Sequence, residues 1–81
     1  IICGHVRATS NARDRLRGYR RAMDEAGIPL VDSRRAEVNH SIDAGLEGLE
    51  SLLVSGGDFD GIVVGGEIWT AAIVLRLTIM L

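Results

Sequence analysis

The stretch that decides the fold is Phe59-Asp60-Gly61-Ile62-Val63-Val64-Gly65-Gly66-Glu67-Ile68-Trp69. It holds a continuous apolar run at residues 62–64, which is followed by two glycines, by Glu67 and then by a second apolar segment from Ile68. Continuous apolar runs are typical of strands that are buried on both faces, as in parallel sheets. The stretch therefore predicts a buried strand at residues 62–64, followed by a helix that starts at Glu67.

Two earlier segments repeat this order of strand and helix. Residues 1–3 are typical of the end of a buried strand, and residues 36–38 predict a short strand near a sheet edge. A helix is predicted after each of them, because apolar residues recur there at spacings of three and four. The apolar stripe of the first helix is Leu16, Tyr19, Met23 and Ala26, and that of the second is Ile42, Leu46, Leu49 and Leu53.

The ends of these two helices are also marked. Thr9, Ser10 and Asn11 are good N-cap types for the first helix, and Ser41 is a good N-cap for the second. Gly27 and the pair Gly56-Gly57 are typical helix stops. Alternating strands and helices predict an α/β fold, a doubly wound parallel sheet with flanking helices. Gly18, Gly45 and Gly48 fall inside the helices, where we expect close packing against the sheet.

The last predicted helix starts at Glu67, and its residues 68–81 leave almost no polar face, with Arg76 and Thr78 as the exceptions. It is too short for a membrane span. Three interpretations stay open: a helix buried on several sides, including by a partner subunit; the edge of a larger domain; or a join across a gap, with Thr78–Leu81 belonging to another element. Since the chain starts and stops inside apolar runs, we expect it to be a fragment of a longer domain.

Composition narrows the function. The net charge is −2, which argues against nucleic-acid binding by this segment itself, because such domains carry a basic excess. The single cysteine, Cys3, is best interpreted as a small buried hydrophobe. Neither a dinucleotide-binding nor a Walker phosphate motif is present, and two histidines alone do not predict a metal site. We therefore expect no cofactor and no metal, and no secretory signal is visible.

Ligands of open parallel sheets bind beyond the carboxyl ends of the strands. Residues 5–15, Asn39-His40 and residues 65–69 lie at such ends. Arg15 stands near a helix start, where a cation gains nothing from the helix dipole, so a binding role is a natural explanation. The alternatives are ordinary ones: Arg15 as a solvated surface charge, His40 as a loop histidine, Glu67 as a carboxylate favoured by the dipole, and Trp69 as a core or interface residue.

The segments together resemble the effector-binding domain of LacI/GalR-type bacterial transcriptional repressors, which is similar to periplasmic binding proteins. The most specific match is the block from Ala12 to Tyr19 followed by Arg20 to Ile28, which ends in Glu25-Ala26-Gly27-Ile28. Residues 2–4, 41–53 and 59–64 match further family patterns, so the likeness spans about residues 1–76. It implies that residues 1–81 are a fragment of that domain, mostly one lobe, without the DNA-binding helix-turn-helix.

The resemblance also implies roles for three residues. Arg15 occupies the position of an arginine that contacts the small-molecule effector, and His40 replaces an aromatic residue that stacks on it. The family's Asn-Asp after the third strand is here Gly66-Glu67, so Glu67 keeps the carboxylate and the amide is lost. A sugar-like or nucleoside-like effector is implied, with a cytoplasmic homodimer that binds DNA through an absent N-terminal domain and responds by a hinge-linked population shift.

Two other functions remain open at this point. The same fold serves extracytoplasmic sugar-binding proteins of transporters, which carry a secretory signal and no DNA-binding domain. A doubly wound α/β enzyme is the second alternative, and it needs a general base or metal carboxylates at the strand ends. Only Asp14 and Glu67 are candidates, and they are not paired in the sequence. We therefore predict that the chain is not an enzyme.

Overall fold

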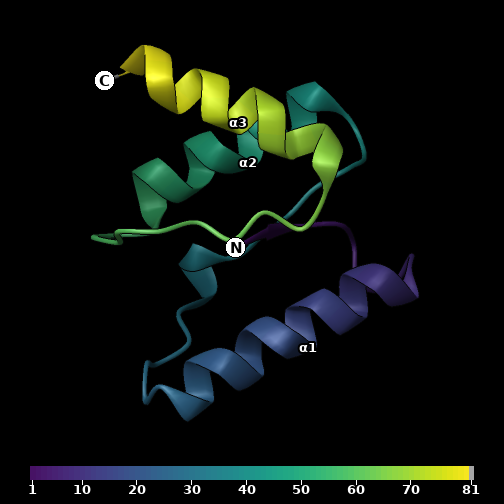
Figure 1. Ribbon diagram of the computed structural model, residues 1–81, viewed down its shortest axis with the longest axis vertical. Coiled ribbons are helices and arrows are strands. Elements are labelled where there is room, and N and C mark those ends of the chain that lie inside the picture. Colours follow the sequence, from purple (N-terminus) through teal and green to yellow (C-terminus); the bar gives the residue numbers. More distant parts are fainter. Residues whose placement is uncertain (81) are drawn as a thin grey trace.

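A computed structural model describes residues 1–80 (Figure 1). The elements, in chain order, are β1 (Ile2–Cys3), α1 (Ser10–Glu25), the short 3-10 turn η1 (Asp32–Arg34), β2 (Ala36–Glu37), α2 (Ile42–Ser55) and α3 (Glu67–Met80). Figure 1 shows α1 on one side of the strands and α2 with α3 on the other. The predicted helices are thus present in the predicted order.

The strands run parallel, with β1 in the middle. Ile2 of β1 lies opposite Ala36 of β2 and also forms a parallel bridge with Val64 on its other side. The strand predicted at residues 62–64 is wrong in extent, because it is reduced to this bridge. Val63 is 52% exposed, so the expected burial on both faces is wrong as well. The physical reason is that residues 62–65 are paired along one edge only, with β1, through the hydrogen bonds from Ile2 N–H to Val63 O and from Gly65 N–H to Ile2 O.

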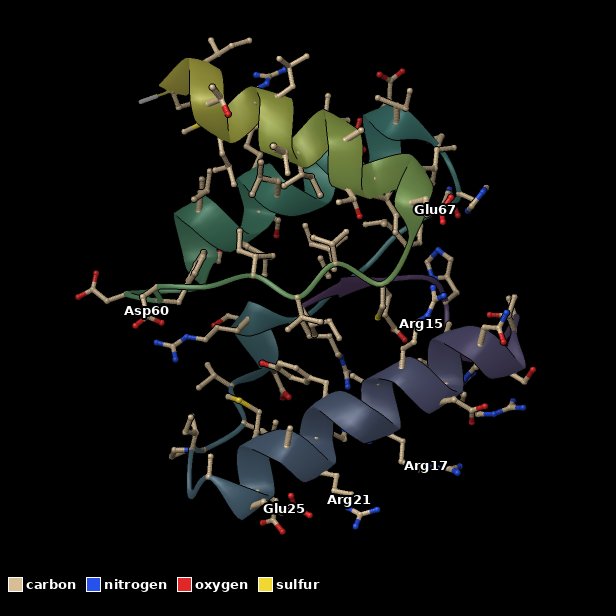
Figure 2. The ribbon with its side chains drawn as sticks, in the orientation of Figure 1. Arg15, Arg17, Arg21, Glu25, Asp60 and Glu67 are labelled. Carbon is tan, nitrogen blue, oxygen red and sulfur yellow. The ribbon has the colours of Figure 1, made fainter. Side chains whose placement is uncertain are left out.

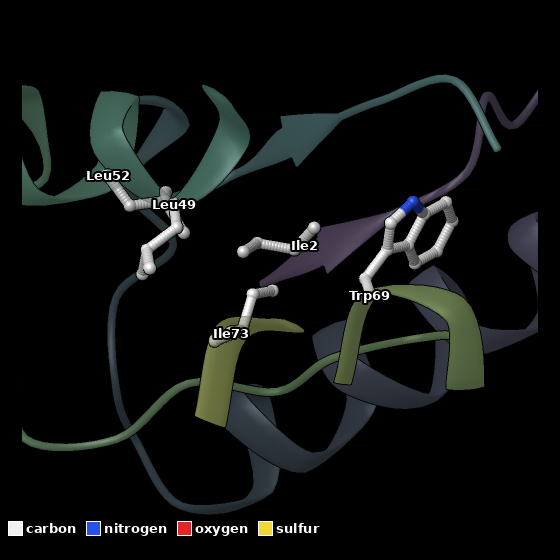
Figure 3. Close-up of a cluster of buried hydrophobic side chains, with 5 residues drawn as sticks. All are labelled: Ile2, Leu49, Leu52, Trp69 and Ile73. Carbon is white, nitrogen blue, oxygen red and sulfur yellow. The ribbon is translucent and has the colours of Figure 1, made fainter. Parts of the chain in front are cut away.

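The side chains along β1 point alternately into two separate hydrophobic cores. Ile2 is fully buried in the larger one with Leu49 and Leu52 of α2 and Trp69 and Ile73 of α3 (Figure 3). Ile1 and Cys3 point to the other face, where they pack on Leu16 of α1. Successive side chains of a strand point to opposite faces. Helices therefore cover both faces of the strands, although a complete doubly wound sheet remains a prediction.

Helix α1 begins and ends as expected. The Thr9 hydroxyl accepts a hydrogen bond from Ala12 N–H at 3.1 Å, and Gly27 takes the left-handed conformation with φ of 70°. Leu16 is buried, whereas Ala26 is exposed, so the inner stripe starts one turn earlier than predicted, at Ala12.

Helix α2 is capped by Ser41, whose hydroxyl accepts from Ala44 N–H, as predicted. Its predicted stripe is correct at Leu49, which is buried, but wrong at both ends, because Ile42 is 54% and Leu53 is 42% exposed, while Leu52 is buried. The helix instead turns Gly45 and Gly48 inward.

Both glycines allow close packing, Gly48 against the strands as predicted and Gly45 against helix α3 instead of the sheet. A Cβ at Gly45 would lie 2.5 Å from Cδ1 of Trp69, and one at Gly48 would lie 2.8 Å from Cγ1 of Val38. For Gly18 the expectation is wrong, because a Cβ there would meet nothing within 4 Å.

Helix α3 is continuous from Glu67 to Met80, so the interpretation that Thr78–Met80 belong to another element is wrong; Leu81 lies outside the described residues. The helix buries Trp69 and Ile73 but leaves Val74, Leu75, Ile79 and Met80 more than half exposed. No helix within residues 1–80 has the length and apolar character needed to cross a membrane.

Candidate functional site

The candidate site lies where the chain leaves the carboxyl ends of β1, β2 and the Val64 bridge. From β1 the chain passes to β2 on one side and later returns to Val64 on the other. Such a reversal is a topological switch point, the place where open α/β sheets bind ligands. Here the structure has a hollow of about 450 Å³. It is lined by Gly4, His5, Ala8, Thr9, Asn11, Ala12, Arg15, Val38, Asn39, His40, Gly65, Gly66 and Trp69.

An adjoining hollow of about 570 Å³ brings the three predicted site residues together. Arg15, His40 and Glu67 line it with Gly66 and Ile68. Figure 2 shows Arg15 of α1 and Glu67, at the start of α3, on the same side of the molecule. We call the two adjoining hollows the strand-end cleft. The convergence predicted from topology is therefore present, and the binding roles of the three residues stay predictions.

Arg15 extends from α1 toward the end of the bridge segment. Its Nη1 donates a hydrogen bond to the carbonyl oxygen of Gly65, which joins α1 to the turn before α3. The side chain is otherwise exposed, so the remaining guanidinium donors stay available to a ligand. Arg15 thus has a structural contact that the sequence did not predict, beside its place in the cleft.

Trp69 forms the floor of the cleft and belongs to the core, being only 3% exposed. Its Nε1–H donates to the carbonyl oxygen of Asn39 at 3.1 Å, and the His40 ring meets it edge-on with centroids 5.7 Å apart. The indole also explains the glycine at position 66, because a Cβ there would lie 2.8 Å from two ring atoms. A side-chain amide at position 66 is therefore incompatible with Trp69 in this place.

His5 lies in the predicted strand-end segment 5–15 and lines the cleft, but no binding role of its own was predicted for it from the sequence. Its Nε2 lies 3.0 Å from Oδ1 of Asn39, so the loop after β1 is joined to the loop after β2. The sequence feature that indicates its place is the position of His5 directly after Gly4, at the end of a predicted strand. His5 contacts Asn39 rather than His40, and within residues 1–80 no three His, Cys, Asp or Glu side chains gather as metal ligands do.

The chemistry of the cleft is that of binding. Arg15 offers a fork of donors, Glu67 is the single carboxylate among the lining residues, and His40 offers a ring edge. General acid–base catalysis needs a proton acceptor placed beside a nucleophile or a second titratable group. Arg15 and Glu67, which line the same hollow, suit the recognition of hydroxyl groups.

A larger hollow of about 710 Å³ lies at the opposite, amino-terminal side of the strands. Its walls come from α1 and residues 58–63, with Tyr19, Met23 and Phe59 among them. Sheet topology places ligand sites at the other end of the strands. We therefore assign the candidate site to the strand-end cleft, although each of its two hollows is smaller than this one.

Comparison with known proteins finds two relatives. The chain is 34% identical over 53 residues to catabolite control protein A of Priestia megaterium. The matched residues cover 65% of this chain and 16% of that protein. It is 35% identical over 46 residues to the HTH-type transcriptional regulator DegA of Bacillus subtilis (strain 168), covering 57% of this chain and 14% of the relative. No family model matches, and neither does any solved structure.

The chain thus spans about one sixth of the length of the curated relatives that it matches. Both relatives are regulatory proteins by name, and neither name denotes an enzyme. The comparison supports the resemblance at the level of a bacterial transcriptional regulator. It does not separate an effector-binding segment from a DNA-binding one.

Proposed function

We propose that this chain is part of the ligand-sensing domain of a bacterial transcriptional regulator, with a small-molecule effector bound in the strand-end cleft. The observation that carries the proposal is the meeting of Arg15, His40 and Glu67 around one hollow at a topological switch point. The similarity to two regulators supports the setting. The effector class is a sugar or a nucleoside, since hydroxyl pairs suit a guanidinium fork facing a carboxylate.

A DNA-binding head is the competing assignment within the same class of regulator. A helix-turn-helix joins its two helices by a turn of about three or four residues. Here residues 56–66 separate α2 from α3, and residues 26–41 separate α1 from α2. The parallel pairing of β1 with β2, together with the net charge of −2, also favours the sensing domain over the head.

In the proposed mechanism the effector shifts a population between two arrangements of a longer protein. A ligand changes such an equilibrium only by binding one state more tightly than the other. Arg15 on α1 and Glu67 at the start of α3 belong to opposite layers of this lobe, so a ligand held by both would stabilise one mutual placement. In a homodimer of that longer protein, the change would alter the spacing of the DNA-binding heads, which lie outside residues 1–81.

The test uses Trp69, the single tryptophan of the sequence, as an internal reporter on the floor of the cleft. Fluorescence is titrated with a panel of sugars and nucleosides, and binding is confirmed by calorimetry. We expect one class to change the Trp69 emission with saturation. The Arg15→Ala variant should weaken that binding by about tenfold or more, because a charge-assisted hydrogen bond contributes about 1.5–3 kcal/mol.

Arg17→Ala is the matched control. Arg17 lies on the same helix, its side chain is 77% exposed, and its one ion-pair contact, with Asp14, is long at 4.0 Å. This variant should bind like the parent chain. Equal affinities for the Arg15→Ala and parent chains, or no saturable response from any sugar or nucleoside, would contradict the proposed site.

A further inference from the structure

One pair of side chains joins the loop after β1 to the loop after β2. Nε2 of His5 lies 3.0 Å from Oδ1 of Asn39. Since Oδ1 is an acceptor, Nε2 carries the hydrogen and donates it. The other hydrogen bond between two side chains within residues 1–80 joins Arg21 to Glu25 and stays inside α1. The His5–Asn39 bond is therefore the one that connects separate segments of the described chain.

The main chain of Asn39 is equally engaged. Its carbonyl oxygen accepts hydrogen bonds from Nε1–H of Trp69 at 3.1 Å and from the N–H of Ser41 at 2.9 Å. A backbone carbonyl oxygen has two lone pairs, so both are in use. Asn39 thus links three segments: the loop after β1 through its side chain, and the indole of α3 and the N-cap of α2 through its carbonyl oxygen.

His5 and Asn39 lie at the solvent side of the cleft. Both line the hollow of about 450 Å³ and are exposed, whereas Trp69, which forms its floor, is buried. The loop after β1 also starts against the indole, because a Cβ on Gly4 would lie 3.6 Å from its Cη2. The other recorded bond from this loop to β2, from Val6 N–H to Oε1 of Glu37, is long at 3.3 Å.

We propose that His5 and Asn39 form a gate of the strand-end cleft. The gate is closed while the two side chains are hydrogen-bonded, and it opens when the loop after β1 moves away from Asn39 and uncovers the indole of Trp69. An exposed hydrogen bond is readily exchanged for bonds to water. Such a contact can break in a local opening that leaves the rest of the fold intact.

The gate gives His5 a positioning role in the cleft. His5 holds the Asn39 side chain, and the same residue holds the indole nitrogen through its carbonyl oxygen. Losing the His5 contact should therefore loosen the floor of the cleft as well as its entrance. The role of the gate in admitting an effector rests on the proposed function, whereas the opening itself is measurable without any effector.

The experiment follows the indole N–H of Trp69, the single tryptophan, by hydrogen–deuterium exchange in nuclear magnetic resonance spectra of the whole chain. His5→Ala should speed this exchange about fivefold, the factor that one hydrogen bond is typically worth. Quenching of the Trp69 emission by acrylamide, a small uncharged solute, should rise in parallel. Arg7→Ala is the matched control, because Arg7 is exposed on the same loop but does not line the cleft; it should change neither readout.

A double-mutant cycle separates a gate from two unrelated structural roles. Asn39→Ala removes Oδ1 but keeps the carbonyl oxygen, so it should match His5→Ala. The double variant should stay at about fivefold instead of reaching about twenty-fivefold, because the two side chains form one contact. His5→Gln should restore slow exchange, since its side-chain amide can donate to Oδ1.

The inference is overturned by effects that multiply in the double variant, by a glutamine variant that behaves like His5→Ala, or by exchange and quenching that no substitution changes. It is also overturned if Arg7→Ala has the same effect as His5→Ala. A chain that shows the expected pattern but binds no sugar or nucleoside has the gate without the proposed effector. A chain that binds one of them without this pattern has the effector site and no gate.

Discussion

Replacing Gly45 by alanine tests the packing that forms the floor of the cleft. The new Cβ would lie 2.5 Å from Cδ1 of Trp69 and 3.0 Å from its Cγ. The ring cannot move away freely, because its Nε1–H donates a hydrogen bond to the Asn39 carbonyl oxygen and because Gly66 lies against its six-membered ring. The clash must therefore be relieved by shifting α2 away from α3.

The magnitude follows from two opposing effects. Overpacking a filled core costs about 1–3 kcal/mol, and a rigid indole puts this case at the upper end of that range. Alanine in place of glycine inside a helix returns about 1 kcal/mol. We expect Gly45→Ala to lower the free energy of unfolding by about 2 kcal/mol, which for a chain of this size means a fall in Tm of about 8–16 °C.

Gly18→Ala is the matched control on α1. A Cβ at Gly18 meets nothing within 4 Å, so only the propensity gain remains. This variant should raise the free energy of unfolding by about 0.5–1 kcal/mol. Two chemically identical substitutions are thus expected to differ in sign.

Urea unfolding followed by Trp69 fluorescence and by far-ultraviolet circular dichroism measures both variants. The Gly45→Ala chain should also show a shifted native emission, because the indole environment changes. If Gly45→Ala proves as stable as Gly18→Ala, with unchanged emission, then α2 does not pack on Trp69 as described. The floor of the cleft would then have to be assigned to other residues.

Two other predictions concern groups outside the cleft. Burial and, to a lesser extent, the nearby Glu37 carboxylate raise the pKa of the Cys3 thiol. The folded state therefore holds the thiol proton more tightly than the unfolded chain does. The free energy of unfolding should accordingly fall as the pH rises above about 8.5, the ordinary pKa of a cysteine. The Cys3→Ala variant should lack this part of the decline in urea titrations at pH 8 to 10, and an unchanged slope would contradict the burial. Arg34→Met should cost about 1–2 kcal/mol in the same assay, because Nε and Nη2 of Arg34 donate to the carbonyl oxygens of Gly56 and Asp58 at 2.6 and 2.9 Å; a loss within error would show that the turn holds without them.

The sequence predicted helices and caps well because their signals are local. Ser41 and Gly27 act through hydrogen bonds and φ angles within a few residues of themselves, and both positions are as expected. The inner side of α2 was predicted only in part, because Ile42 and Leu53 fit the apolar spacing yet are exposed, and because the contact of Gly45 with an indole of α3 carries no hydrophobic signal. A glycine that admits a neighbouring ring looks in sequence like a weak point of the helix.

The third strand shows the complementary limit. Its apolar run is unmistakable, yet a strand needs backbone partners on its edges, and those depend on segments far away in the sequence. Here only Ile2 provides them, so one bridge forms at Val64. For the candidate site, topology sufficed to bring Arg15, His40 and Glu67 together, whereas the link between His5 and Asn39 depends on side-chain geometry that periodicity does not encode.

Arg15 shows how structure changes a prediction about function. From sequence, Arg15→Ala is expected to abolish effector response while leaving the fold intact. The hydrogen bond from Nη1 to Gly65 means that the same substitution also removes a link between α1 and the turn before α3. Since the side chain is exposed, we expect a small loss of stability, about 0.5–1 kcal/mol, beside the larger loss of affinity.

Arg15→Lys separates the two roles. An ammonium group can still donate one bond to the Gly65 carbonyl oxygen, but it lacks the planar fork that binds two acceptors at once. If Arg15 binds the effector, the lysine variant should keep the stability of the parent chain and still lose most of the affinity. If stability and affinity instead recover together in the lysine variant, Arg15 acts only as a link between α1 and α3, and the effector contacts lie elsewhere in the cleft.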